Sequence, residues 1–286
     1  MTEPFGLLNV LKPPGMSSHD VVGAVRRLVG TRRVGHGGTL DPAAAGVMTV
    51  AVGKATRLLG YLRDDKAYRA VVRFGLATDS ADAEGKVTAR ADASGLTADA
   101  LAAALPAFRG EITQRPPMTS AVHVDGKRLY ELARAGVTLP DEAIPTRQVT
   151  IHRLELVDLA GPTARLDVHC SAGTYIRSLA VDLGATLGLP ACLEFLLRTA
   201  AGDCKLAAAQ TLEELAEAPC WMPEDAWLGH LALQVIDEHE ISEIGFGRRI
   251  AAQQAYEQAV RLRGPDGRLV ALATLAGSQL QPVLVF

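Results

Sequence analysis

The sequence lacks any uncharged apolar run of the about 18 residues that a membrane-spanning helix requires. Its opening stretch, MTEPFGLLNV, also lacks the basic region followed by an apolar segment that marks a secretory signal peptide. We therefore expect a cytoplasmic protein with no membrane partner. The length of 286 residues suffices for one large domain, or for a large domain and a small one.

Cysteine is scarce, and the four cysteines are widely separated: Cys170, Cys192, Cys204 and Cys220. None of them forms a CxxC pair, the spacing typical of zinc and redox sites. His169 and Cys170 are neighbours, but adjacent residues of a strand point to opposite faces and would not ligate one ion. In a cytoplasmic chain we expect reduced, buried cysteines and no metal site.

Three motifs of common enzyme classes are missing. A Walker A loop requires GxxxxGK[ST], but Gly53-Lys54 is followed by Ala55 and lacks the first glycine. A GxGxxG dinucleotide fingerprint that began at Gly35 would need a glycine where Leu40 stands. The GxSxG nucleophile elbow of esterases occurs nowhere in the chain. These absences exclude a P-loop enzyme, a dinucleotide-binding enzyme of this fingerprint and an esterase of this type.

Charge is unevenly distributed, although the net charge is only −3. The first quarter of the chain is basic and contains Arg26, Arg27, Arg32, Arg33, Lys54, Arg57, Arg63, Lys66, Arg69 and Arg73. Between residues 203 and 243 the charge is mostly acidic, with Glu213, Glu214, Glu217, Glu224, Asp225, Asp237, Glu238 and Glu240. A polyanion could therefore bind the N-terminal face, because partners respond to local charge. The alternative is an ordinary solvated surface.

Apolar spacing predicts both helices and strands. A helix that Ser17 or Ser18 can cap is predicted through residues 21–29, with others over residues 97–108 and from Thr174 to a C-cap at Gly188. Buried or alternating strands are predicted at 46–53, 67–75, 148–159 and 164–170. The absence of a regular β-α-β rhythm predicts an α+β fold. From about His230, short strands and tight turns predict a small β module at 259–264, 268–275 and 282–286.

The stretch GHGGTLDP, residues 35–42, combines three glycines with a histidine and an Asp41-Pro42 pair. Glycine is favoured where the backbone turns with positive φ or closely approaches a ligand. The stretch is therefore either a structural turn, in which an aspartate before proline caps the backbone, or a loop that presents Asp41 for chemistry.

Four ordered blocks decide between these interpretations. They are KPPGMSS at 12–18, GHGGTLDPAAAGVMTVAVGKATRL at 35–58, KAYRA around Tyr68 and GTYIRSLAVDLG at 173–184. Together they closely resemble the TruB family, the bacterial tRNA pseudouridine-55 synthases. The resemblance runs from about Leu7 to about Gly202.

The resemblance implies a pseudouridine-synthase fold of class α+β, with a mixed, largely antiparallel sheet flanked by helices. A catalytic domain would occupy residues 1–229, and residues 230–286 would form a small PUA-like RNA-binding domain, for which the match is weak. A segment near 121–146 falls where the family has a mobile loop that clamps RNA. An ordinary surface helix is the alternative there.

The implied activity is isomerisation of uridine to pseudouridine at position 55, in the T-arm of tRNA. The enzyme breaks the N1–C1′ bond, turns the base and joins C5 to C1′, after flipping the nucleotide out of the RNA. The resemblance implies no cofactor and no metal, because neither redox chemistry nor phosphoryl transfer is involved. It also implies tRNA as the partner of a monomer that requires no protein subunit.

The resemblance also assigns the site residues. Asp41 matches the essential aspartate, which must be ionised. Arg177 matches the arginine that orients it, and a guanidinium within ~4–6 Å would lower the pKa of the carboxylate by ~1–3 units. Tyr68 matches the tyrosine that stacks on the target base and takes part in proton transfer, and Tyr175 resembles a second base contact. Leu196 aligns with the leucine that closes the pocket.

Two further residues and one departure complete the comparison with the family. His36 corresponds to the histidine that fills the space vacated in the RNA, and Lys12 supports the loop or a phosphate. The family usually shows Leu-Arg-Arg-Thr near the end of the catalytic domain, whereas this chain has Leu197 before Arg198. This replacement bears on RNA affinity rather than on chemistry.

Two other functions are considered. The first is a tRNA-folding chaperone, which would bind RNA without using Asp41. The second is the catalytic subunit of a guide-RNA complex, as in archaeal and eukaryotic relatives. The short N-terminus and the lack of lysine-rich tails argue against the second.

Overall fold

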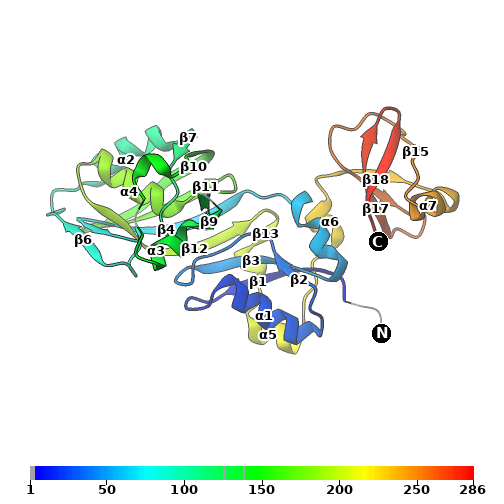
Figure 1. Ribbon diagram of the computed structural model, residues 1–286, viewed down its shortest axis with the longest axis horizontal. Coiled ribbons are helices and arrows are strands. Elements are labelled where there is room, and N and C mark those ends of the chain that lie inside the picture. The colour runs from blue at the N-terminus through cyan, green and yellow to red at the C-terminus, as the bar shows by residue number, and fades with distance from the viewer. Residues whose placement is uncertain (1–3, 121, 125, 138) are drawn as a thin grey trace.

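Two separate β-sheets form the two lobes of the molecule, as the computed structural model shows (Figure 1). The structure describes residues 4–120, 122–124, 126–137 and 139–286. Within these ranges no helix is long and apolar enough to cross a membrane.

The larger sheet has nine strands among the described residues, in the order β1-β3-β12-β4-β11-β10-β7, with β2 beside β3 and β13 beside β12. They are β1 (Gly6–Lys12), β2 (Val34–His36), β3 (Ala45–Val52), β4 (Lys66–Phe74), β7 (Gly110–Gln114), β10 (Arg147–Ala160), β11 (Thr163–Cys170), β12 (Ala191–Ala201) and β13 (Cys204–Lys205). The β3–β12 pair is parallel and the other pairs are antiparallel. The predicted mixed, largely antiparallel sheet is confirmed.

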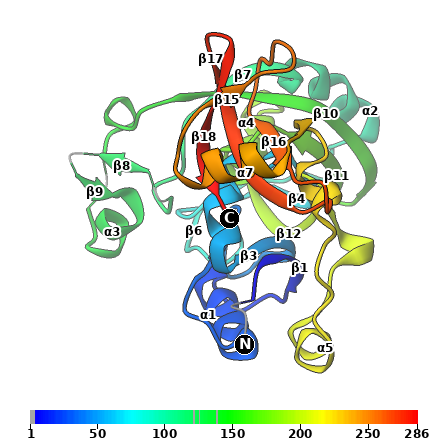
Figure 2. The same ribbon diagram turned by 90° about the vertical axis from the view of Figure 1, so that its right-hand side faces the viewer.

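Helices and short elements surround this sheet. They are α1 (Ser18–Val29), η1 (Gly53–Tyr61), α2 (Ala98–Ala104), η2 (Leu105–Phe108), α3 (Leu129–Arg134), η3 (Asp141–Ala143), α4 (Ile176–Thr186), η4 (Leu206–Ala208), α5 (Leu212–Glu217) and the hairpins β5 (Leu76–Thr78) with β6 (Val87–Arg90) and β8 (His123–Val124) with β9 (Lys127–Arg128). Ser17, one of the two predicted caps, begins α1 through a reciprocal capping box with Asp20. Figure 2 shows β8, β9 and α3 projecting from one side of the molecule.

Strand β12 is absent from the sequence prediction, although it lies at the centre of the sheet between β3 and β4. Its run Phe195-Leu196-Leu197 hides the alternation that marks a strand, because a register shift falls between Leu193 and Phe195. Apolar side chains also lie on both faces of this strand, since Leu196 is buried and its neighbour Phe195 is 41% exposed.

The two faces of β4 differ in chemistry. Its Tyr68, Val72 and Phe74 belong to the main hydrophobic core, together with Leu179 and Leu183 of α4. The residues between them point to the opposite face, as the two-residue period of a strand requires. There Arg69 forms an ion pair with Asp167 of β11 at 2.8 Å. The core therefore lies between the sheet and α4, and the other face of β4 carries paired charges.

The smaller lobe is a five-stranded sheet in the order β14-β16-β17-β18-β15, with helix α7 packed beside it (Figure 2). Its elements are β14 (Ala232–Val235), α7 (Glu238–Gly245), β15 (Ile250–Ala251), β16 (Val260–Arg263), β17 (Leu269–Ala276) and β18 (Gln279–Val285). The predicted C-terminal β module is confirmed. Helix α7, which begins at the Asp237 N-cap, is absent from the sequence prediction.

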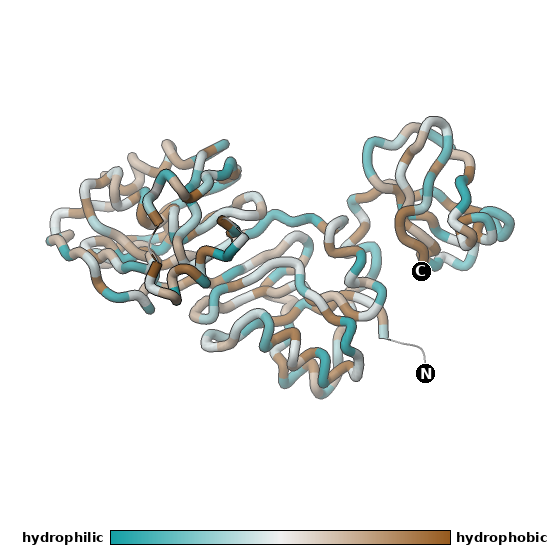
Figure 3. The backbone as a smooth tube through the Cα atoms, in the orientation of Figure 1, coloured by the Kyte–Doolittle hydropathy of each residue, from teal (hydrophilic) through white to brown (hydrophobic). Residues whose placement is uncertain are grey.

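Helix α6 (Glu224–Leu228) joins the two lobes. Its Trp227 and Leu228 belong to one apolar cluster with Leu58 of η1 and Leu272 of β17. Hydrophobic segments in Figure 3 follow the strands of both lobes, whereas the link between η1 and β4 is hydrophilic. The shared cluster makes the lobes depend on each other for burial of apolar surface.

Candidate functional site

A cleft of about 1600 Å³ opens beside the loop that carries Asp41. Segments far apart in the sequence line it, including residues 36–42, the start of β4, the turn at 79–86, part of α3 and the start of α4. The cleft contains Asp41, Tyr68, Arg177, His36, Tyr175 and Leu196. Six of the seven predicted site residues therefore meet at one place, and Lys12 does not line the cleft.

Lys12 binds backbone carbonyl groups of the loop that carries Asp41. It is fully buried, and its Nζ donates to the carbonyl oxygens of Pro13 at 2.8 Å, Pro42 at 3.0 Å and Ala44 at 2.6 Å. These bonds use all three N–H groups of the ammonium. Burial lowers the pKa of Lys12 to about 8, while the charge of Asp41 opposes this shift. Of the two predicted roles, the geometry favours loop support over phosphate contact, because no donor is left for a ligand.

Arg198 holds the other end of the same loop. Its guanidinium donates to the carbonyl oxygens of Val47 at 2.7 Å, Thr39 at 3.1 Å and Gly38 at 3.1 Å. Gly46 has φ +120°, and a Cβ there would lie 2.2 Å from the carbonyl oxygen of Arg198, so a side chain would collide with β12. Two buried cations thus fix a loop whose backbone depends on glycine.

Arg177 binds both carboxylate oxygens of Asp41. Its Nε lies 3.1 Å from Oδ2, and its Nη2 lies 3.2 Å from Oδ1. Such two-pronged pairing fixes the plane of a carboxylate as well as its charge. The Arg177 side chain is 6% exposed and that of Asp41 is 41% exposed, so the carboxylate remains accessible from the cleft.

The sequence analysis missed the groups that position Arg177. The guanidinium donates to the hydroxyl and the carbonyl oxygen of Thr119, and to the carbonyl oxygen of Ser80. A second carboxylate, that of Asp82, lies 3.6 Å from Nη1. Arg177 stands in the first turn of α4, where a positive charge is unfavourable for the helix dipole, and these carboxylates compensate for it.

The net pKa shift of Asp41 is upward. Burial raises the pKa of this carboxyl, Arg177 opposes the shift, and the nearby charge of Asp82 raises the pKa further. The predicted lowering of the pKa by Arg177 is confirmed as one contribution, but burial of Asp41 and the second carboxylate, neither of them visible in the sequence, outweigh it.

Tyr68 and Leu196 form an apolar wall of the cleft. They are 9% and 8% exposed and come from the adjacent strands β4 and β12. Burial raises the pKa of Tyr68 to about 12, and Arg198 opposes this shift. The phenol is therefore neutral near pH 7, and an aromatic ring lies in the same cleft as the Asp41 carboxylate.

Tyr175 occupies the N-cap of α4. The buried side chain of Gln114 fixes its backbone, because it accepts from the Tyr175 N–H at 2.9 Å and donates to the Tyr175 carbonyl oxygen at 3.2 Å. The guanidinium of Arg147 lies 5.4 Å from the centre of the Tyr175 ring, a cation–π distance. Tyr175 thus lines the cleft from a backbone position that Gln114 fixes.

His36 and Leu197 bear on the two remaining predictions. His36 ends β2 at the cleft, its Nδ1 accepts from the Gly38 N–H at 3.2 Å, and burial lowers its pKa. Leu197 lies between Leu196 and Arg198 on β12, so its side chain points to the face away from the cleft. The departure from the family pattern therefore does not alter the lining of the cleft.

The cysteines stand apart from this site. All four are free, and Cys170, Cys192 and Cys204 are buried as expected. Cys220 is exposed, so the expectation of burial was wrong for this residue.

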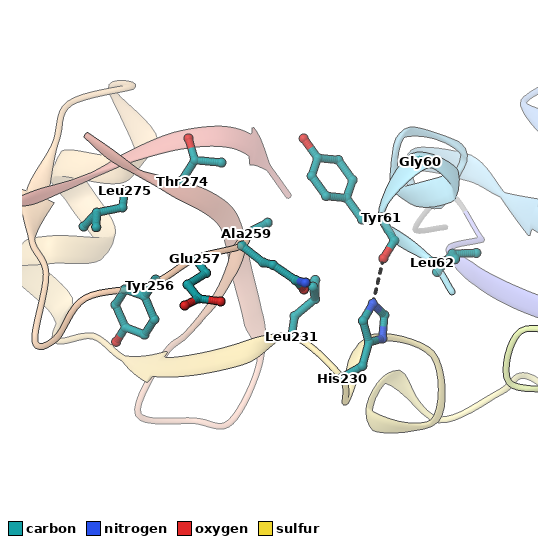
Figure 4. Close-up of a pocket in the computed structure, with 11 residues that line it drawn as sticks. Gly60, Tyr61, Leu62, His230, Leu231, Tyr256, Glu257, Ala259, Thr274 and Leu275 are labelled. Carbon is teal, nitrogen blue, oxygen red and sulfur yellow. Dashed lines mark hydrogen bonds between the residues drawn. The ribbon is translucent and has the colours of Figure 1, made fainter. Parts of the chain in front are cut away.

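A second pocket, of about 480 Å³, lies between the two lobes (Figure 4). It is lined by residues 60–62 and by segments of the small lobe around His230 and Tyr256. The Nε2 of His230 lies 3.0 Å from the carbonyl oxygen of Tyr61, which joins the lobes at this point. Glu257 is the one carboxylate among the described residues that line it, and it has no basic neighbour in the lining comparable to Arg177. The Asp41 cleft is the better candidate for catalysis.

The Asp41 cleft combines an oriented carboxylate with an aromatic and aliphatic wall. A planar ring can stack on Tyr68 while an atom attached to that ring meets Asp41. A carboxylate in this position can act as a nucleophile or as a base on the bound group.

Comparison with known proteins identifies the family of the chain. Residues 26–176 match the family model described as TruB family pseudouridylate synthase, N-terminal domain. A protein of Symbiobacterium thermophilum named tRNA pseudouridine synthase B is 54% identical, over 80% of this chain and 78% of that protein. A protein of the same name from Moorella thermoacetica is 48% identical, over 94% of this chain and 93% of that protein.

Solved structures give the same result for the fold. The structure of an H/ACA RNP bound to a substrate RNA that contains 2′-deoxyuridine matches with a TM-score of 0.74 at 25% identity, over 99% of this chain and 85% of that one. A Cbf5-Nop10-Gar1 complex matches with a TM-score of 0.74 at 26% identity, over 98% and 84%. By sequence and by fold, the chain belongs to the TruB family of pseudouridylate synthases.

Proposed function

We propose that the protein isomerises uridine to pseudouridine at position 55, in the T-arm of tRNA, with Asp41 as the catalytic residue. The observation that carries this proposal is the two-pronged Arg177–Asp41 pair beside Tyr68 in one cleft. The relatives named tRNA pseudouridine synthase B support tRNA as the substrate.

The residues of the cleft have distinct roles in this reaction. The target uridine leaves the RNA stack and its base lies on Tyr68, with Leu196 and Tyr175 closing the pocket. Arg177 orients the ionised Asp41 toward the nucleotide, where the N1–C1′ bond breaks. After the base turns, C5 joins C1′, C5 loses its proton and N1 gains one. Tyr68, neutral because its pKa is about 12, takes part in this proton transfer through its hydroxyl.

His36 and the β8–β9–α3 segment are proposed to contact RNA outside the pocket. His36 lies at the rim of the cleft and fills the space that the flipped nucleotide leaves in the RNA. The segment near 121–146 closes over the bound RNA, and the projection of β8, β9 and α3 from the body in Figure 2 suits such a clamp. Residues 121, 125 and 138 of this segment lie outside the described residues.

We divide the chain into a catalytic domain at 1–229 and a PUA-like RNA-binding domain at 230–286. The separate five-stranded sheet supports this division, although α6 packs against both sheets. We further propose that the protein works in the cytoplasm as a monomer without a protein subunit. A role in folding tRNA, independent of Asp41, is compatible with the same binding surface.

One assay tests the proposal against the guide-RNA alternative, which the similarity to the H/ACA RNP structure raises. Purified protein is mixed with unmodified tRNA in the absence of any guide RNA, and pseudouridine is measured at each uridine. The proposal expects pseudouridine at position 55 alone. Conversion that requires a guide RNA or added protein would contradict it. Tyr68→Phe, which keeps stacking but loses the hydroxyl, should bind tRNA normally and react more slowly.

A further inference from the structure

Lys66 differs from the other buried cations in how little of its hydrogen-bonding capacity the protein uses. Lys12 and Arg198 each donate to three carbonyl oxygens, Arg177 faces two carboxylates, and Arg261 pairs with a carboxylate. Lys66 is 7% exposed, and its Nζ donates to the backbone carbonyl oxygen of Asp64 at 2.6 Å. An ammonium carries three N–H donors, so two of them have no acceptor in the part of the chain that the structure describes.

No carboxylate of the described residues lies within 4.0 Å of the Lys66 Nζ. The carboxylate of Asp65 binds the ring of His169 at 2.6 Å, and the contact of Asp64 with the Lys66 Nζ is made by its backbone carbonyl. Burial and the charge of Arg198 lower the pKa of Lys66, while Asp64 and Asp65 oppose this shift. A buried cation without a paired anion is costly, and such a position is suited to an anionic ligand.

The position of Lys66 relates it directly to the reaction site. It precedes Tyr68 by two residues on β4, so both side chains point to the same face, and both line the cleft with Asp41. Gly38 lies above it, and a Cβ at Gly38 would be 3.4 Å from the Lys66 Cε. Lys66 therefore lies between Tyr68 and the loop that carries Asp41. We expect the sugar and phosphates of a nucleotide whose base stacks on Tyr68 to lie there.

The chemistry of the ligand follows from charge. Lys66 and Arg198 place two cations next to each other at the base of the loop, and this raises the local positive potential. The phosphodiester is the anionic group of an RNA, and a lysine ammonium binds it as a point charge. The uracil carbonyls are neutral and would leave the buried charge uncompensated.

We propose that Lys66 binds one of the two phosphates flanking the flipped-out uridine, which holds the sugar against Asp41. This inference rests on the proposed function. The contact forms only when the nucleotide has left the stack, so it assists flipping and the chemical step more than initial docking.

The test is a cycle between a protein variant and a neutral linkage in the RNA. Lys66→Met keeps the apolar stem and removes the charge. A T-arm stem-loop RNA carries one methylphosphonate, either 5′ or 3′ of the target uridine. With wild-type protein, one of these linkages should slow single-turnover pseudouridine formation about tenfold or more. With Lys66→Met the unmodified RNA should already be slowed to that extent, and the same linkage should cause no further loss.

The matched control is Lys54→Met, an exposed lysine of the basic first quarter that does not line the cleft. With this variant, the ratio of the single-turnover rates for the methylphosphonate RNA and the unmodified RNA should equal that of the wild type. If Lys66→Met and each methylphosphonate slowed the reaction independently, so that their effects multiplied when combined, the assignment would be overturned. If Lys66→Met does not fold, Lys66→Gln enters the same cycle.

Dissociation constants of the same RNAs separate this inference from the proposed function. Wild-type protein that shows the linkage effect in binding but forms no pseudouridine would overturn the function and support the phosphate site. Wild-type protein that forms pseudouridine with no coupling between Lys66 and either linkage would overturn the phosphate site alone.

Discussion

The guanidinium of Arg177 contacts both oxygens of the Asp41 carboxylate, at 3.1 and 3.2 Å, although the two residues are 136 positions apart. The loop on one side of this pair is held by Lys12 and Arg198, and the arginine on the other side is held by Thr119 and Asp82. The carboxylate is therefore oriented before any substrate binds. Preorganisation of this kind lowers the cost of reaching the reactive geometry.

Replacement of Asp41 by Asn should abolish the reaction without abolishing binding. The substitution keeps size and most hydrogen bonds but removes the ionised oxygen, and we expect single-turnover pseudouridine formation to fall by about 10⁴-fold or more. The tRNA should still bind, because phosphate contacts elsewhere supply most of the affinity. A variant that reacts near the wild-type rate would contradict the role assigned to Asp41.

The acid limb of the pH–rate profile should respond in opposite directions to two neighbours of Asp41. Reaction requires the ionised carboxylate, so activity falls as the pH drops through its pKa, which lies above the usual 3.8. Arg177→Lys weakens the two-pronged contact that favours the charged form, so the limb should move to higher pH. Asp82→Asn removes a repelling charge, so the limb should move to lower pH.

Single-turnover rates measured across the pH range with saturating tRNA would test this pair of shifts. Asp182→Asn is a control, because Asp182 lies on α4 but does not line the cleft. Shifts in the same direction for Arg177→Lys and Asp82→Asn would mean that the limb reports another group.

Binding should depend on the basic N-terminal face. Arg32 and Arg33 are exposed, and the acidic helix α5 lies beside α1 of the same lobe. Log affinity for tRNA should fall steeply with log salt, and Arg32→Glu with Arg33→Glu should reduce the slope by about 1–2 as phosphate contacts are lost. Filter binding over a salt series measures both quantities.

Charge reversal on the acidic helix provides the comparison. Glu213→Lys with Glu217→Lys should leave the salt slope close to that of the wild type, since both residues are exposed on α5. Glu214 is unsuitable, because its carboxylate accepts from the N-cap Thr211 N–H at 2.8 Å. If the substitutions on α5 changed the salt slope and those at Arg32 and Arg33 did not, the RNA would not bind at the basic N-terminal face.

The candidate site residues could be predicted from the sequence, but the residues that position them could not. Asp41, Tyr68 and Arg177 stand in distinctive local blocks, so each was predicted and the structure brings them into one cleft. Asp82 and Thr119 stand in turns with ordinary composition, and only the tertiary fold brings them to Arg177. Burial is likewise a property of the fold, which is why the net upward shift of the Asp41 pKa could not be predicted from Arg177 alone.

The same limit explains the elements that were missed. Helix α1 and the strands β4, β10 and β11 carry clear periodicity and were predicted, whereas β12 has three consecutive apolar residues, Phe195, Leu196 and Leu197, and is interrupted by a register shift. Helix α7 is eight residues long and rich in acidic residues, so its capping signal at Asp237 was the one local cue. Short elements depend on tertiary packing more than on propensity.

The last prediction concerns Lys12, whose ammonium is fully buried against three carbonyl oxygens. Its pKa is about 8 in the folded protein and 10.5 when exposed. Between these values the unfolded chain binds more protons than the folded one, so this residue makes stability rise with pH. The rise contributes at most about 3 kcal/mol to the free energy of unfolding, and it is lost as the pH falls through 8.

The test is denaturant unfolding of the wild type and Lys12→Met from about pH 7.5 to about 10.5, an interval that covers both pKa values of Lys12. It measures the difference in the free energy of unfolding between the two proteins. The wild type should gain stability relative to Lys12→Met across this interval, because other groups that titrate there are common to both. Lys12→Met should also lose catalytic rate, since the Ala44 carbonyl loses its Lys12 donor, the Pro42 carbonyl keeps the Gly15 N–H alone, and the Asp41 loop is held less firmly. If the stability difference did not change with pH, the buried ammonium would not be charged in the way described. A loop that kept full activity without Lys12 would show that Arg198 alone suffices to position Asp41.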